Sequence, residues 1–156
     1  EAGAEGTSLH YLMRCAGCGT KNRVSEQRLE NSPKCGKCGA VLKTRELFEP
    51  QPIAISQYNF ADKVLRSPLP VLVYAMSPTC PSCGVVGPHI EAFAKEHRGR
   101  IRVGRLNIQS SPELAARFDI MSVPYLLIFD RGQLQESMPG GLDRVGLAQV
   151  MSRYLY

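Results

Sequence analysis

Several features that would restrict this chain to particular protein classes are missing from its sequence. No apolar run approaches the roughly 20 residues that a membrane-spanning helix requires. The first eight residues have neither the basic nor the apolar segment of an export signal, and the chain contains no tryptophan. We therefore expect a soluble, monomeric, cytoplasmic protein that does not enter a membrane, with residues 1–8 as a disordered tail or an expression remnant.

What the chain does contain is enough material for one ordinary domain and a small additional module. It has 156 residues, 44% of them apolar, and a net charge of +5. The positive charge is concentrated near the N-terminus, where residues 10–48 hold eight Lys/Arg against three Asp/Glu. A basic module can bind nucleic acid, but it also balances the charge of about −2 that four thiolates leave around Zn²⁺. We favour charge balance and solubility, so nucleic acid is not an expected partner.

All six cysteines fall into Cys-x-x-Cys pairs, and the first two pairs have the spacing of a zinc site. Cys15 and Cys18 are followed, after sixteen residues, by Cys35 and Cys38. This spacing lies within the range of four-cysteine zinc modules, whose short turns direct two sulfurs each toward one ion. The alternative is a pair of disulfides. We predict one Zn²⁺ per chain, and a structural role for it because four ligands leave no open coordination position.

The zinc module is expected to cover residues 9–48 and to need its metal for stability, because its large apolar side chains are few. A linker, residues 49–52, follows, since Pro50 and Pro52 interrupt regular structure.

Residues 53–156 show alternating strand and helix patterns that predict an α/β domain with a mixed central sheet and helices on both faces. The turn at Asp130–Gly132 makes the last two strands a hairpin. The basic side chains of Arg98, Arg100 and Arg102 near the third strand are expected to form a solvated face, with recognition of a partner protein as the alternative. The expected strands are 53–55, 71–76, 101–107, 125–129 and 133–137, and the expected helices are 57–66 with Ser56 as N-cap, 83–98, 112–118 and 143–155.

The third cysteine pair, Cys80 and Cys83, follows a buried strand and opens a helix. The free N–H groups and the dipole at a helix start stabilise a thiolate, so Cys80 is the expected nucleophile toward a substrate disulfide and Cys83 the resolving thiol. The alternatives are half of a metal site or a chance pair.

Residues 53–156 resemble the thioredoxin family, and the whole chain from about Leu9 resembles its bacterial zinc-ribbon type. The matching features include Cys80-x-x-Cys83 at the active site, Pro88 in the following helix and Val123-Pro124 at the position of a cis-proline. Further matches are Leu106-Asn107-Ile108, the Phe129–Gly132 turn and Gly140. The resemblance implies a thioredoxin fold preceded by a small zinc ribbon.

The resemblance also implies a function, namely reduction of protein disulfides in cell redox homeostasis, with re-reduction by a thioredoxin reductase. In this family the backbone before the cis-proline pairs with an extended substrate segment. Val123 and Pro124, together with Thr79 beside the cysteines, are therefore implied substrate-binding residues.

The active site departs from the family pattern at three positions that we expect to tune its redox potential. Pro81 and Ser82 stand between the cysteines in place of Gly-Pro, and Tyr74 stands in place of a buried aspartate that helps to deprotonate the resolving cysteine. Tyrosine has an ordinary pKa near 10 and is a poor base at neutral pH. Tyr74 is either a core residue, which we favour, or a proton-transfer group.

These departures leave other functions open. A more oxidising active site would make the chain a thiol oxidase or isomerase, and a third possibility is a redox-sensing binding module built on the basic zinc ribbon.

Overall fold

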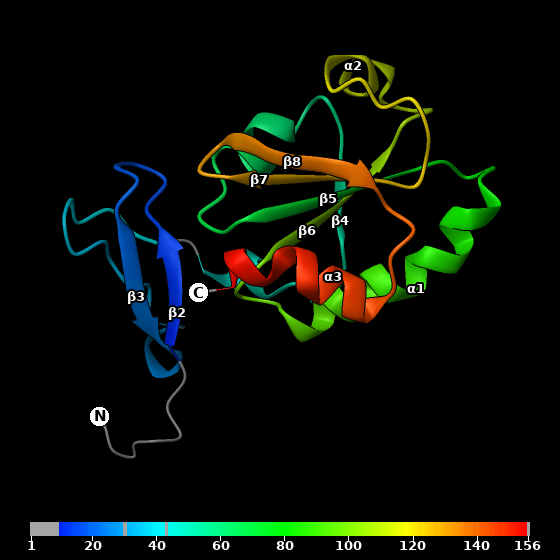
Figure 1. The fold of residues 1–156 in the computed structure, drawn as a ribbon. Helices are drawn as coiled ribbons and strands as arrows, with labels where there is room; N and C mark the ends of the chain where they lie inside the picture. Colours follow the sequence, from blue (N-terminus) through cyan, green and yellow to red (C-terminus); the bar gives the residue numbers. More distant parts are fainter. Residues whose placement is uncertain (1–9, 30, 43, 156) are drawn as a thin grey trace.

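The computed structural model describes residues 10–29, 31–42 and 44–155, and it divides into an N-terminal module and a larger C-terminal domain (Figure 1). The tail expected at residues 1–8 lies outside the described residues. In the N-terminal module, strands β2 (His10–Arg14) and β3 (Lys21–Ser25) form an antiparallel hairpin. Two short 3₁₀ helices follow, η1 (Glu26–Arg28) and η2 (Arg45–Phe48), and the second leads into the C-terminal domain.

The C-terminal domain is built on a five-stranded mixed sheet in the order β4-β6-β5-β7-β8. The strands β4, β6 and β5 are parallel, and β7 and β8 form the predicted antiparallel hairpin. Their bounds are β4 Ile53–Ile55, β5 Val71–Met76, β6 Arg102–Asn107, β7 Tyr125–Asp130 and β8 Gln133–Pro139.

Helices cover both faces of this sheet, as the sequence predicted. The helices α1 (Pro81–Glu96) and α3 (Arg144–Met151), followed by the 3₁₀ helix η4 (Ser152–Tyr154), pack on one face. The helix α2 (Pro112–Arg117) and the π-helical segment η3 (Ala61–Leu65) pack on the other.

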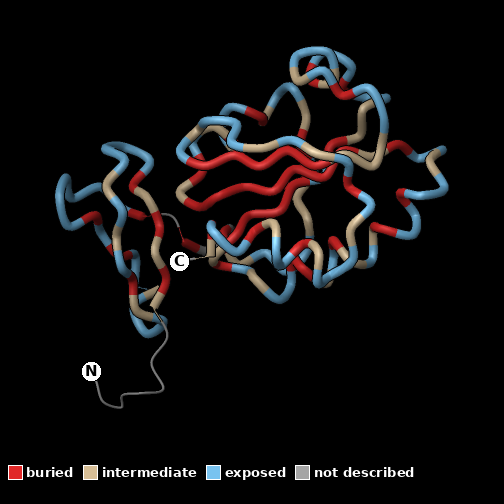
Figure 2. The backbone as a smooth tube through the Cα atoms, in the orientation of Figure 1, coloured by how far each residue is buried: buried red, intermediate tan, exposed pale blue. Residues whose placement is uncertain are grey.

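The central strand β5 contributes side chains to the apolar cores on both faces of the sheet, because successive side chains of a strand point in opposite directions. Leu72 and Tyr74 face α1 and α3, whereas Val73 and Ala75 face η3 and α2. Figure 2 shows the resulting concentration of buried residues in the central strands. Burial on both faces holds β5 in place, and its end therefore positions the residues that follow it.

The helix predicted at 57–66 is shorter than expected. The Asn59 side-chain oxygen accepts from the Ser56 backbone N–H at 2.8 Å, and its amide donates to the Ala54 carbonyl at 2.8 Å. These bonds hold residues 56–59 in a turn because asparagine competes with the helix for backbone groups. Regular helical structure consequently begins only at Phe60, and η3 is its π-helical continuation.

The N-terminal module packs against the end of the sheet at which β5 and β6 begin (Figure 1). Leu69, which precedes β5, completes the core of the module. The Arg14 backbone N–H donates to the Pro68 carbonyl at 2.7 Å, and the Gly99 N–H donates to the Leu47 carbonyl at 2.9 Å. The module is thus held by shared apolar burial and by backbone hydrogen bonds.

Of the arginines predicted to form a solvated face near β6, Arg98 is exposed, whereas Arg100 is half-buried and Arg102 is buried. The Arg100 guanidinium lies 4.8 Å from the centre of the Tyr11 ring and donates to the His10 carbonyl at 3.5 Å. Arg102 is 7% exposed and donates to the Lys63 carbonyl at 2.9 Å. The prediction was wrong for these two residues because the N-terminal module and η3 cover the start of β6.

Candidate functional site

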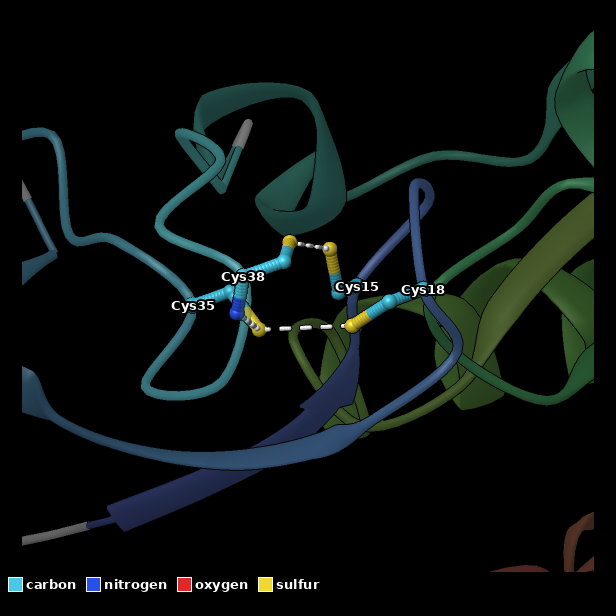
Figure 3. Close-up of side chains that lie close together, drawn as sticks. All are labelled: Cys15, Cys18, Cys35 and Cys38. Atoms are coloured by element: carbon cyan, nitrogen blue, oxygen red, sulfur yellow. Dashed lines mark hydrogen bonds between the residues drawn. The ribbon is translucent and has the colours of Figure 1, made fainter.

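The four N-terminal cysteines come together into one cluster from two loops (Figure 3). Their sulfurs all lie within 4.8 Å of one another; the Cys15–Cys38 and Cys18–Cys35 pairs are separated by 3.5 and 3.6 Å. A tetrahedral ion with metal–sulfur bonds of about 2.3 Å places its sulfurs about 3.8 Å apart. The cluster therefore fits a four-thiolate metal site.

The two cysteine loops have the same backbone hydrogen bonds. The Gly19 and Gly39 N–H groups donate to the carbonyls of Cys15 and Cys35 at 2.8 and 3.0 Å. Both glycines have φ near +80°, at +78° and +79°, a conformation that other residues rarely adopt. The Cys38 N–H, the Asn22 side chain and the Lys37 N–H lower the pKa of Cys35 to about 6. The loop around Cys35 thus favours the thiolate that a metal requires. The pKa of Cys38 is instead raised to about 11, because the Ala40 backbone, which lowers it, is outweighed by hydrogen bonds with the Cys15 and Cys18 sulfurs.

The second candidate site lies at the opposite end of β5, where the chain passes from Met76 to α1 (Figure 1). Cys80 is the N-cap of α1, and its sulfur accepts the Cys83 backbone N–H at 3.1 Å. Both thiols are free. Cys80 is half-buried and Cys83 is 4% exposed. The pair therefore presents one accessible sulfur, supported by a helix N–H, and one covered sulfur.

The Val123-Pro124 peptide bond is cis, as expected, and its loop lies beside the accessible sulfur. The Cys80 thiol donates to the Val123 carbonyl at 3.6 Å, although the two residues are 43 positions apart. Gly140 completes this arrangement, because its N–H donates to the Pro124 carbonyl at 2.9 Å. A Cβ at Gly140 would lie only 3.1 Å from the Pro124 carbonyl carbon. Glycine at this position therefore favours the close approach of these two loops.

Tyr74 lies directly beneath the cysteine pair. Its side chain is 3% exposed, and its hydroxyl donates to the Cys83 carbonyl at 2.8 Å. Burial raises the pKa of Tyr74 well above its ordinary value, so it remains protonated at neutral pH. The structure thus places Tyr74 in the core, as favoured, and adds a bond to the active-site helix.

The covered thiol, Cys83, is held in its neutral form. Burial raises its pKa most, followed by its hydrogen bond with Cys80; the Ser77 backbone and the Tyr74 hydroxyl act in the opposite direction. None of the described groups that shift this pKa is a carboxylate. With tyrosine at position 74 in place of the family's aspartate, the Cys83 thiol thus has a neutral hydroxyl beside it where the family has a carboxylate.

The loop before Cys80 contains a polar network that the sequence analysis missed. The Thr79 hydroxyl lies 3.1 Å from the Ser77 hydroxyl and accepts the Gln109 amide at 3.2 Å. The Ser77 carbonyl accepts the Cys80 N–H at 3.1 Å. Local serine turns can be read from sequence, but Gln109 comes from the loop after β6 and carries no such signal. Pro81 and Ser82 are exposed beside this network.

In the described part of the chain, no helix has the length and apolar character needed to cross a membrane.

Comparison with known proteins agrees with this two-part structure. The thioredoxin family model matches residues 51–153, and the model for the N-terminal part of thioredoxin 2 matches residues 14–40. Thioredoxin C-3 of Corynebacterium nephridii is 30% identical over 144 residues, which cover 92% of this chain and 95% of that protein. A thioredoxin of Synechocystis is 34% identical over 101 residues, 65% of this chain and 94% of the relative. The chain therefore belongs to the thioredoxin family of thiol-disulfide oxidoreductases and carries a thioredoxin 2 type zinc-ribbon domain ahead of its thioredoxin domain.

Proposed function

We propose that this protein reduces disulfide bonds in other proteins by dithiol–disulfide exchange, with Cys80 as nucleophile and Cys83 as resolving thiol. The observation that supports this assignment most is the position of the Cys80 sulfur. It is half-buried, it accepts a helix N–H at 3.1 Å and it lies 3.6 Å from the Val123 carbonyl. The N–H stabilises the thiolate, and the Val123 loop offers a backbone edge beside it.

The exchange proceeds in two balanced steps. The Cys80 thiolate attacks one sulfur of the substrate disulfide, which forms a mixed disulfide and releases the other substrate sulfur as a thiolate. Cys83 then loses its proton and attacks the Cys80 sulfur. The second substrate sulfur leaves as a thiolate, and the enzyme retains a Cys80–Cys83 disulfide. The substrate has gained two electrons from the enzyme, and a thioredoxin reductase supplies two further electrons that reduce the Cys80–Cys83 disulfide again.

The surrounding residues divide into substrate contacts and tuning groups. Val123 and Pro124 receive an extended substrate segment, and Thr79 contacts it from the opposite loop. Pro81 and Ser82 set the stability of the Cys80 thiolate, because a change of about 30 mV corresponds to only about 1.4 kcal/mol for this two-electron couple. Because the zinc cluster needs four thiolates and the Cys80–Cys83 pair must be reduced again after each turnover, we place the protein in the reducing cytoplasm.

The four-cysteine cluster holds one structural Zn²⁺. Four thiolates complete a tetrahedral zinc site and leave no position for a substrate. The purified protein should contain about one zinc per chain, in keeping with a single four-thiolate site. A different metal, or a disulfide between any two of these cysteines in the active protein, would contradict the assignment.

Insulin reduction with dithiothreitol as electron donor tests the reductase activity. Cys80→Ser should abolish turnover, and Cys83→Ser should accumulate the mixed disulfide with the substrate, visible by mass spectrometry. The redox potential against glutathione separates reductase from oxidase. A potential near about −120 mV, typical of a strong thiol oxidase, would refute the reductase assignment.

A further inference from the structure

A cavity of about 170 Å³ lies between the zinc ribbon and the thioredoxin domain, and its lining includes none of the six cysteines. The ribbon contributes one wall and the start of the thioredoxin domain the other. The lining residues are Met13, Arg14, Ala16, Val41 and Leu42 from the ribbon, and Asp62, Arg66, Pro68 and Arg102 from the thioredoxin domain. Neither domain alone could form this cavity.

The charges around the cavity favour an anion. Two of its guanidinium groups, Arg14 and Arg66, form no ion pair with a carboxylate among the described residues. Arg14 uses one N–H to donate to the Gly19 carbonyl at 3.3 Å, which leaves further donors of its five. Asp62 is the only acidic residue among the lining residues, and its carboxylate lies 3.6 Å from the Lys63 amine.

The remaining wall is apolar. Met13 and Leu42 are buried at 1% and 5% exposure, and they belong to the core of the ribbon. Val41 is 54% exposed and lies at the cavity rim. An inorganic anion would leave this apolar surface uncovered. An organic anion would cover it with its apolar part and present its charged group to the arginines.

The size of the cavity limits the ligand further. A cavity of about 150 Å³ accommodates benzene. We propose that this cavity is a binding site for a small organic anion, a carboxylate with a ring-sized apolar group, held by Arg14 and Arg66 and packed against Met13 and Leu42. Because both domains contact such a ligand, its binding holds the ribbon in its docked position.

Benzoate is a suitable probe, added to the full-length, metal-loaded, reduced protein at constant ionic strength. We expect saturable shifts of the Met13 and Leu42 backbone amides in NMR spectra, with a dissociation constant of about 1 mM or below. The Cys83 amide should not move. Inorganic phosphate has the negative charge without the ring, and benzyl alcohol has the ring without the charge. Each should bind at least about tenfold more weakly than benzoate.

Arg66→Gln and Arg14→Gln should each weaken benzoate binding roughly tenfold, whereas Arg23→Gln, on the exposed ribbon surface away from the cavity, should leave it unchanged. Val41→Glu places a carboxylate at the rim and should weaken benzoate binding as well, because it repels the anion. Since Val41 is exposed, this variant should preserve the fold, to be verified by circular dichroism. Equal binding by wild type and the arginine variants would overturn the proposal. So would equal binding of benzoate and benzyl alcohol, or no saturation up to about 20 mM.

Discussion

The hydrogen bond between Tyr74 and the active-site helix leads to a prediction that separates anchoring from proton transfer. Tyr74→Phe removes the hydroxyl that donates to the Cys83 carbonyl at 2.8 Å and leaves the buried ring in place. A lost hydrogen bond of this kind costs about 1 kcal/mol. For a protein of this length that corresponds to a decrease of about 2–4 °C in the melting temperature.

The effect on the chemistry should be small. A tyrosine with its ordinary pKa near 10 is ionised to only about one part in a thousand at pH 7, and burial raises the pKa of Tyr74 further. It therefore cannot act as an efficient base for Cys83. Because its hydroxyl slightly opposes the raised pKa of Cys83, the variant should slow the resolving step, by less than about tenfold.

Single-turnover reaction with dithiobis(nitrobenzoate) measures this step directly. Attack by Cys80 releases the first thionitrobenzoate and attack by Cys83 releases the second. Tyr154→Phe is a matched control, because it removes another buried hydroxyl, which lies in η4 and is bonded to Glu136 at 2.8 Å instead of to the active-site helix. A decrease of more than about a hundredfold in the second release, specific to Tyr74→Phe, would refute anchoring and establish proton transfer.

Three further results are expected. Gly99→Ala should lower the free energy of unfolding by about 2 kcal/mol or more, because Gly99 has φ +82° and an added Cβ would overlap the Phe48 ring; Gly19→Ala, at φ +78° with open space around it, should cost less, and equal costs would exclude the steric effect. Burial, and then a carboxylate partner, raise the pKa of Tyr154 to about 12, so the folded protein keeps this proton when the unfolded chain has lost it. The contribution of this proton to stability is present below about pH 10 and lost toward about pH 12. The free energy of unfolding, measured with urea from about pH 9 to about pH 12, should therefore fall more for wild type than for Tyr154→Phe, and an equal fall in both proteins would disprove the prediction. Removal of the ribbon metal by a chelator should reduce the chemical-shift dispersion of the amides of residues 10–42 in NMR spectra. It should change the alkylation rate of Cys80 less than about twofold, because the two sites lie at opposite ends of β5, and a tenfold change would show coupling between them.

Much of the thioredoxin domain could be predicted because its strands and helices are encoded locally. The apolar run at 71–76 and the turn at Asp130–Gly132 coincide with β5 and the β7–β8 hairpin. Helix α1 begins at Pro81, two residues before the predicted start, since Cys80 is its N-cap. The helix predicted at 57–66 begins only at Phe60, because the Asn59 side chain competes for backbone groups, which helical periodicity does not reveal.

The predicted substrate-side residues, Thr79, Val123 and Pro124, remain proposals, but the structure places Thr79 immediately before Cys80 and Val123 against its sulfur. The partners of Thr79 could not be predicted. Gln109 reaches it from a loop 30 residues away, and that contact depends on the parallel pairing of β5 and β6. Likewise, the packing of Arg100 on Tyr11 joins residues that the sequence assigned to separate modules.

The sequence by itself determined which cysteines belong together, because each Cys-x-x-Cys turn is local and its spacing reflects either a metal or a redox pair. It also determined that position 74 lacks a carboxylate. Tertiary structure alone decided how the two domains meet: the ribbon core is completed by Leu69, and Arg14 and Arg66, from different domains, line one cavity. Such contacts arise from surfaces formed only after each domain has folded, and local sequence patterns carry no record of which surfaces will then be buried together.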